Sequence, residues 1–188
     1  MHSGTGRKQA IESLTQFFCE SLLPQRIHPE VIDVLHFVSG DLLADHYDIF
    51  CHQVNCMATM GTGLAAQVKK IYPEVTGKYY LFCFDHKDDI DSMLGRVLYV
   101  KTRDNKWCVN MFAQKDYGQD KRYTDYKAFD SCLEHLKNKL KISDKNLTVG
   151  FPDHIGCGLA GGDWNIILDK LQKFAEQVEQ KVYIVKKE

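Results

Sequence analysis

The sequence predicts an α/β domain of three layers, in which helices cover both faces of a β-sheet. Apolar runs of strand length alternate along the chain with segments of helical periodicity, which is the pattern of this class. Two strand-like runs end in related phrases, Gly61-Thr62-Gly63-Leu64-Ala65 and Gly156-Cys157-Gly158-Leu159-Ala160, and a helical segment follows each. With 188 residues, 44% of them hydrophobic, the chain is large enough for one such domain.

The first half of the chain is expected to begin with a helix. Apolar residues recur at helical spacing between Arg7 and Leu23, and Pro24 and Pro29 then interrupt the pattern. We therefore assign residues 1–30 to an N-terminal helical extension and residues 31–188 to the α/β domain. The elements expected next are strands at Val31–Val38 and Asp48–Asn55, a helix from the first glycine phrase to about Tyr72, and a helix that starts at Pro73.

The second half is expected to contain a hairpin and two further strand–helix alternations. Arg103-Asp104-Asn105 separates two apolar runs and is typical of a turn, and Asp163 stands where a helix N-cap belongs. The expected elements are hairpin strands at Gly95–Lys101 and Lys106–Phe112, a helix at Thr124–Leu140, a strand at Leu147–Phe151, a helix from Asp163 to about Val178, and a last strand at Val182–Val185.

The two glycine phrases suggest a ligand that carries phosphate. Glycine allows a positive φ and a close approach of the backbone to a ligand. A helix N-terminus behind the loop offers unpaired N–H groups and the positive end of a dipole, which suits an anion. Two such loops could hold a diphosphate from both sides. The alternative is that each phrase is only a tight turn between a strand and a helix.

A dinucleotide-binding Rossmann domain explains only one of the two phrases. Gly61 and Gly63 with Ala66 fit the relaxed fingerprint, and Asp85 stands near the position of its acidic residue. The phrase that begins at Gly156 fits the strict fingerprint, but it lies too near the C-terminus to open a βαβαβ half.

Composition excludes several classes of function. A net charge of −1 favours neither general nucleic-acid binding nor an anionic membrane surface, and no apolar run reaches the roughly 18 residues of a membrane span. Seven cysteines, several of them inside apolar runs, indicate reduced thiols in the cytoplasm, or in the nucleus of a eukaryote. Cys51 and His52 point to opposite faces of a strand, so no metal site is expected. We also expect no cofactor.

Four phrases, taken in order, resemble the macro domain family. They are Ser39-Gly40-Asp41-Leu42, His52-Gln53-Val54-Asn55-Cys56, Met60-Gly61-Thr62-Gly63-Leu64-Ala65 and His154-Ile155-Gly156-Cys157-Gly158-Leu159. The resemblance extends over about residues 31–185. The most similar branches contain ADP-ribose 1″-phosphate phosphatases, terminal ADP-ribose glycohydrolases and antitoxins that reverse DNA ADP-ribosylation. The resemblance implies a mixed six-stranded sheet between helices, with an ADP-ribose cleft at the crest of the sheet.

The same resemblance implies where each part of ADP-ribose would bind. Asp41 would accept a hydrogen bond from the adenine amino group, and Tyr183 would contact the adenosine. The first glycine loop would approach the distal ribose and the second the diphosphate. The implied ligand contacts are Asp41, Leu42, Asn55, Thr62, Gly63, Leu64, Ala65, Ile155, Gly156, Cys157, Gly158, Leu159, Ala160 and Tyr183. The alternatives are that Asp41 only caps its own turn and that Tyr183 is an ordinary strand aromatic.

Four residues are candidates for catalysis by this resemblance: His52, Asn55, Lys115 and Asp163. Asn55 matches an asparagine beside the distal ribose, and His52 matches a histidine of the phosphatase-like branch that could move a proton near its reference pKa of about 6.5. On a regular strand these two would face opposite sides. The glycohydrolase branch has an aspartate where this chain has Ala160.

The remaining candidates have simpler alternatives. Asp163 would cap a helix, Lys115 would lie on the surface, and His52 would be a buried strand residue bonded to backbone. Two function classes therefore stay open: an enzyme that hydrolyses an ADP-ribose derivative at the distal ribose, or a module that binds ADP-ribose or an ADP-ribosylated macromolecule without chemistry. The sequence does not decide the oligomeric state.

Overall fold

The structure, a computed structural model, describes residues 34–188, and the predicted N-terminal helix lies outside this range. Six strands form one mixed sheet in the order β1-β6-β5-β2-β4-β3. Five of them are parallel, and β3 alone runs antiparallel to its neighbour β4. The strands are β1 (Leu35–Gly40), β2 (Ile49–Asn55), β3 (Val97–Lys101), β4 (Trp107–Gln114), β5 (Thr148–Pro152) and β6 (Lys181–Lys187).

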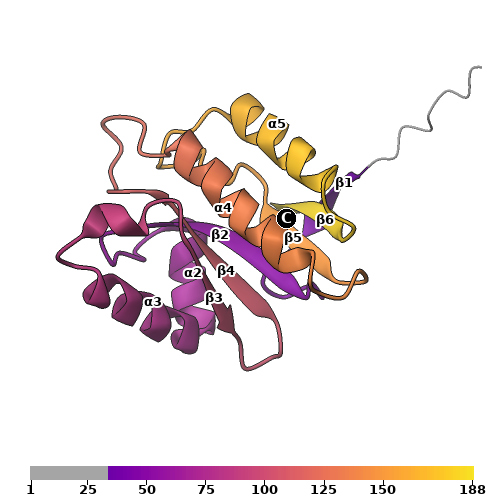
Figure 1. The fold of residues 1–188 in the computed structure, drawn as a ribbon, viewed down its shortest axis with the longest axis horizontal. Helices are drawn as coiled ribbons and strands as arrows, with labels where there is room; N and C mark the ends of the chain where they lie inside the picture. Colours follow the sequence, from indigo (N-terminus) through magenta and orange to yellow (C-terminus); the bar gives the residue numbers. More distant parts are fainter. Residues whose placement is uncertain (1–33) are drawn as a thin grey trace, which may run out of the picture. The chain divides into compact units, whose positions relative to one another are not determined.

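Helices cover both faces of the sheet, as Figure 1 shows, with α4 and α5 on one side and α2 and α3 on the other. The predicted three-layer α/β architecture is therefore confirmed. The helices are α2 (Gly63–Ile71), α3 (Pro73–Asp85), α4 (Tyr126–Leu140) and α5 (Trp164–Ala175), with a short 3₁₀ turn η1 (Ile90–Met93) that the sequence did not predict. Helix α5 ends three residues before the predicted Val178. The predicted end was too late because the apolar pattern continues past the last turn of the helix.

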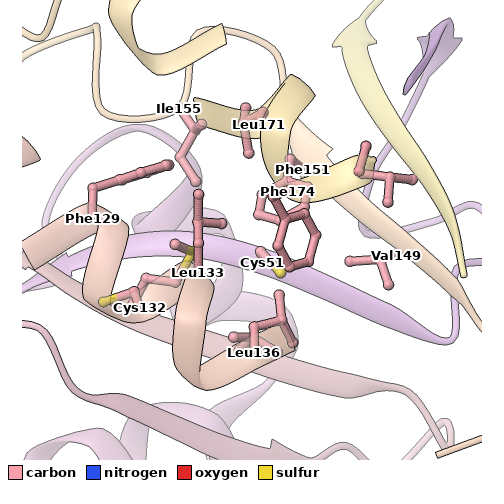
Figure 2. Close-up of a cluster of buried hydrophobic side chains, with 14 of the residues drawn as sticks. Cys51, Phe129, Cys132, Leu133, Leu136, Val149, Phe151, Ile155, Leu171 and Phe174 are labelled. Carbon is pink, nitrogen blue, oxygen red and sulfur yellow. The ribbon is translucent and has the colours of Figure 1, made fainter. Parts of the chain in front are cut away.

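The core below α4 and α5 explains how cysteine is used in this chain. Figure 2 shows Cys51 of β2 and Cys132 of α4 among apolar side chains that include Phe151 and Phe174. Both cysteines are fully buried, and all six cysteines among residues 34–188 are free. Burial raises the pKa of the Cys51 thiol well above its usual value. These cysteines act as small apolar core residues, as predicted.

The strand ends on one side of the sheet are suited to binding a ligand. The carboxyl ends of the five parallel strands all lie along this edge, here called the crest. In open α/β sheets the loops at this edge form the binding crevice. Both glycine phrases lie there, since one follows β2 and the other follows β5.

Candidate functional site

A cavity of about 570 Å³ lies at the crest. Three loops form its walls and the end of β2 forms its floor. The lining residues are His52–Asn55, Thr59, Gly61–Ala65, Gln114, Tyr117–Gln119, Pro152–Gly156 and Gly158–Ala160. The sequence predicted the two glycine loops and the end of β2 but missed the loop that carries Tyr117. This volume is within the range of small-molecule and cofactor sites.

The first glycine loop ends in a helix N-terminus with no side-chain cap. Thr62 occupies the N-cap position of α2, but its side chain makes no capping hydrogen bond. The N–H groups of Gly63, Leu64 and Ala65 in the first turn have no intrahelical partner. Gly63 adopts φ +57°, a conformation that favours glycine. This end of α2 is therefore suited to an anion, as predicted.

The second glycine loop is built differently, as a closed turn. Gly156 adopts φ +72°, and a Cβ there would lie 2.5 Å from Gln53 Oε1. Its carbonyl accepts a hydrogen bond from Gly162 N at 2.9 Å, which closes the turn. Within residues 34–188 the N–H groups of Gly158, Leu159 and Ala160 donate to no other residue. Among the residues that the structure describes, no acceptor competes with a ligand for these three groups.

The second loop differs from the first in two respects. Gly158 has no positive φ, and a Cβ there would meet nothing within 4 Å, so glycine is not required by the backbone at this position. The helix behind the loop, α5, is partly capped, because the Asp163 carboxylate accepts one hydrogen bond, from Asn165 N at 2.8 Å. The two loops supply N–H groups to the same cavity by different means.

His52 forms part of the cavity floor but is only 2% exposed. Its Nε2 lies 2.8 Å from Oδ1 of Asn110, and its Nδ1 is buried without a partner among the described residues. Burial lowers the pKa of His52 from 6.5 to about 4. The prediction that its pKa lies near the reference value is therefore wrong, and the ring is neutral at pH 7.

Asn55 faces the same side of the sheet as His52, although strand alternation predicts opposite sides. The register between β2 and β4 shifts between Val54 and Asn55, which breaks the alternation. The Asn55 Oδ1 accepts hydrogen bonds from Met57 N and Thr59 N at 2.9 and 3.2 Å, and the Tyr79 hydroxyl lies 2.8 Å from the Asn55 carbonyl oxygen and 3.0 Å from Oδ1. Its Nδ2 donates to the Thr59 carbonyl at 2.8 Å. The amide holds the loop after β2 in place, and one Nδ2 hydrogen is left for a ligand.

Lys115 and Asp163 do not line the cavity. The Lys115 ammonium pairs with Asp91 at 2.6 Å, and this hydrogen bond and charge raise its pKa. Its side chain is half exposed. The Asp163 carboxylate caps α5, which is the simpler alternative given above. The catalytic roles of Lys115 and Asp163 stay predictions.

Asp41, Leu42, Cys157 and Tyr183 also lie outside the lining. The Asp41 carboxylate accepts a hydrogen bond from Leu43 N at 2.9 Å, so it does cap its own turn. Tyr183 pairs in register with Gly150 in the body of the sheet and packs against Tyr47. Leu42 is buried in the core. Their contacts with a ligand stay predictions.

The Cys157 thiol is not activated as a nucleophile. Its thiol is partly buried, and burial raises its pKa to about 11. The thiol is protonated at neutral pH, and the thiolate is the reactive form.

A chain of polar side chains connects the floor to two of the walls. Gln53 Nε2 donates to Gln114 Oε1 at 2.7 Å and to the Thr124 hydroxyl at 2.9 Å. That hydroxyl donates to the Gly156 carbonyl at 2.6 Å. Sequence reasoning missed these residues because their partners are 61 and 71 positions away.

Two further lining residues stand side by side just before the second glycine loop. His154 Nδ1 lies 2.9 Å from Oδ1 of Asp153, and its ring stacks on Trp164 with centroids 4.7 Å apart. His154 has φ +56°, and strained non-glycine residues of this kind gather at functional sites.

Two classes of feature are absent from the part of the chain that is described. No three His, Cys, Asp or Glu side chains between residues 34 and 188 gather closely enough to hold a metal ion. No helix in this range is both long enough and apolar enough to cross a bilayer.

Comparison with known proteins identifies the fold. No family model matches the chain. It is 26% identical over 179 residues to an ADP-ribose 1″-phosphate phosphatase of Debaryomyces hansenii, which covers 81% of this chain and 99% of that protein. It is 27% identical over 150 residues to a DNA ADP-ribosyl glycohydrolase of Mycobacterium tuberculosis, covering 77% of this chain and 40% of that protein.

A solved structure supports the same conclusion. The macrodomain of Mycobacterium tuberculosis DarG has a TM-score of 0.68 and 24% identity, over 81% of this chain and 96% of that one. The similarity extends over most of the described residues, and it confirms the predicted macro-domain fold.

Proposed function

We propose that this chain, a macro domain by its fold, binds ADP-ribose in the crest cavity and hydrolyses an ADP-ribose derivative at the distal ribose. The bond cleaved would be a phosphomonoester or an ADP-ribosyl linkage. The names of the relatives, a phosphatase and a glycohydrolase, support a hydrolase of this kind. Free cysteines also suit a reducing compartment such as the cytoplasm.

One observation carries the proposal: two separate sets of unpaired N–H groups line one cavity. The first belongs to the uncapped N-terminus of α2 and the second to Gly158, Leu159 and Ala160. None of the described lining residues is Lys or Arg. An anion in this cavity would therefore be held by backbone N–H groups and the α2 dipole, which is the mode that suits a diphosphate.

The ligand contacts in this proposal follow the placement of the residues. Thr62, Gly63, Leu64 and Ala65 would hold one side of the diphosphate and the distal ribose, and the loop at Ile155–Ala160 the other side. Asn55 would donate its remaining Nδ2 hydrogen to a ribose hydroxyl. Asp41, at the carboxyl end of β1, would accept from the adenine amino group through the carboxylate oxygen that its turn does not use.

A non-catalytic binding module is the second candidate, and three observations favour it. Lys115 is paired outside the cavity, Asp163 caps a helix, and His52 is nearly inaccessible. If the protein does catalyse hydrolysis, His52 is the predicted catalytic residue on the cavity floor that could accept a proton. Its low pKa makes it a weak base and excludes it as an acid at pH 7.

Calorimetry with ADP-ribose tests binding, with AMP and NAD as competitors of related chemistry. We expect one site, with ADP-ribose bound at least tenfold more tightly than either. Gly158→Glu should abolish binding and leave the fold intact, because Gly158 has free space around it and the new carboxylate repels the diphosphate. Gly77→Glu is the matched control, since Gly77 also has free space but lies in α3, away from the cavity. Equal affinity of both variants for ADP-ribose would refute the site.

Activity is tested by incubation with ADP-ribose 1″-phosphate, ADP-ribosylated DNA and ADP-ribosylated protein. Release of phosphate or of free ADP-ribose identifies the bond that is cleaved. His52→Leu should lower kcat by about 10²-fold or more if the ring accepts a proton. Turnover of none of the three by the wild type, together with tight binding of ADP-ribose, would leave the binding module as the function.

A further inference from the structure

The pairing of β2 with β4 places two buried polar side chains beside each other. His52 and Asn110 are direct register partners, and they are 2% and 0% exposed. The His52 Nε2 lies 2.8 Å from the Asn110 Oδ1. Because both groups are buried, water cannot take the place of either partner in this contact.

A second hydrogen bond fixes which way the Asn110 amide points. Its Nδ2 donates to the Leu98 carbonyl of β3 at 3.0 Å. A backbone carbonyl can only accept, so the amide nitrogen must face Leu98 and the amide oxygen must face His52. Because that oxygen can only accept, the His52 Nε2 must carry the proton.

The neutral ring has one N–H, so its other nitrogen, Nδ1, has a bare lone pair. This Nδ1 is buried and has no hydrogen-bond partner among the described residues. Burial keeps the ring neutral by lowering its pKa to about 4. A buried acceptor without a partner is costly, so an acceptor of this kind in a native fold calls for a partner other than residues 34–188.

We propose that Asn110 is a positioning residue that holds His52 as the Nε2–H tautomer, so that Nδ1, which is enclosed in this structure, can accept a hydrogen bond from a hydroxyl of the ligand in the crest cavity once the cavity floor opens around the ring. The proposal rests on the proposed function for the identity of that ligand. A phosphate oxygen is not the partner, because it is itself an acceptor at neutral pH. A ribose hydroxyl is a donor and meets the requirement. His52 would thus recognise the sugar, while the glycine loops hold the diphosphate.

Nitrogen NMR of the full chain labelled with ¹⁵N-histidine tests both parts. The ligand-free wild type at pH 7 should show the His52 ring protonated at Nε2 and bare at Nδ1. Saturating ADP-ribose should shift the Nδ1 resonance and leave Nε2 nearly unchanged, whereas inorganic pyrophosphate should shift neither. A ring protonated at Nδ1 in the free protein would overturn the positioning role. An Nδ1 resonance that ignores bound ADP-ribose would overturn the contact with the hydroxyl.

Asn110→Leu removes the acceptor with little change in side-chain size. We expect its His52 ring to populate the Nδ1–H tautomer and its affinity for ADP-ribose to fall about tenfold, with affinity for pyrophosphate unchanged. Equal losses for both probes would indicate a merely structural role and refute the proposal. If this variant does not fold, the wild-type spectra still decide.

The outcomes also separate this proposal from the proposed function. Calorimetry that detects no ADP-ribose binding would sink the proposed function and the hydroxyl contact together. The tautomer of the free protein would still decide whether Asn110 positions the ring.

Discussion

Acid should destabilise this protein through one buried side chain, His52. In the folded chain its pKa is lowered to about 4 by burial, whereas in the unfolded chain it returns to the ordinary value of 6.5. Between these values the unfolded state binds more protons than the folded state, so stability must fall as the pH falls. The folded state has its full stability from this group above about pH 6.5 and loses it progressively down to about pH 4.

The size of the effect follows from the two pKa values. One unit of pKa difference corresponds to about 1.4 kcal/mol. Between pH 7 and pH 4.5 the linkage relation gives a loss of about 2 kcal/mol from His52 alone. Because small domains are stable by roughly 5–15 kcal/mol, a loss of this size is readily measured.

The assay compares urea unfolding of the wild type and His52→Leu at pH 7 and pH 4.5. Leucine does not titrate, so the variant should lose about 2 kcal/mol less than the wild type over this interval. Its absolute stability is also expected to be lower, since Asn110 Oδ1 loses its partner, but only the change with pH matters here. Other titrating groups are common to both proteins and cancel. The same loss in both proteins would refute the reasoning and indicate that His52 can be protonated in the folded state.

Four further substitutions separate the roles of residues around the cavity. Gly156→Ala should lower the free energy of unfolding by about 1–3 kcal/mol, because its φ of +72° and the nearby Gln53 Oε1 exclude a Cβ, whereas Gly158→Ala should be close to the wild type in urea unfolding. Asp163→Ala should cost about 1 kcal/mol through loss of the α5 cap and leave calorimetric ADP-ribose affinity unchanged; a tenfold loss of affinity would show that this carboxylate reaches the ligand. Asn55→Ala should cost about 2 kcal/mol and expose the following loop to proteolysis, since the N–H groups of Met57 and Thr59 lose their common acceptor; resistance equal to the wild type would argue against this holding role.

The sequence alone was sufficient for the elements whose signals are local. Apolar periodicity placed the strands and helices of residues 34–188 to within a few residues. The turn at Asn105 has the positive φ, +68°, that such a hairpin tip favours. Asp163 was recognised as an N-cap because capping involves residues only two or three positions away. The two glycine phrases were recognised because each follows a strand-like run and precedes a helical segment, and the resemblance to macro domains implied that both lie at the crest.

Only the tertiary structure decided which of the site residues are available for a ligand. The Lys115 ammonium is held by Asp91, and the Asn55 amide by Tyr79 from α3. His52 is bonded to Asn110, 58 residues away, and buried by packing. A pKa and a free lone pair depend on burial and on partners brought from distant segments. Local pattern identifies residue types suited to a site, but long-range packing determines their protonation and their unused hydrogen-bonding groups.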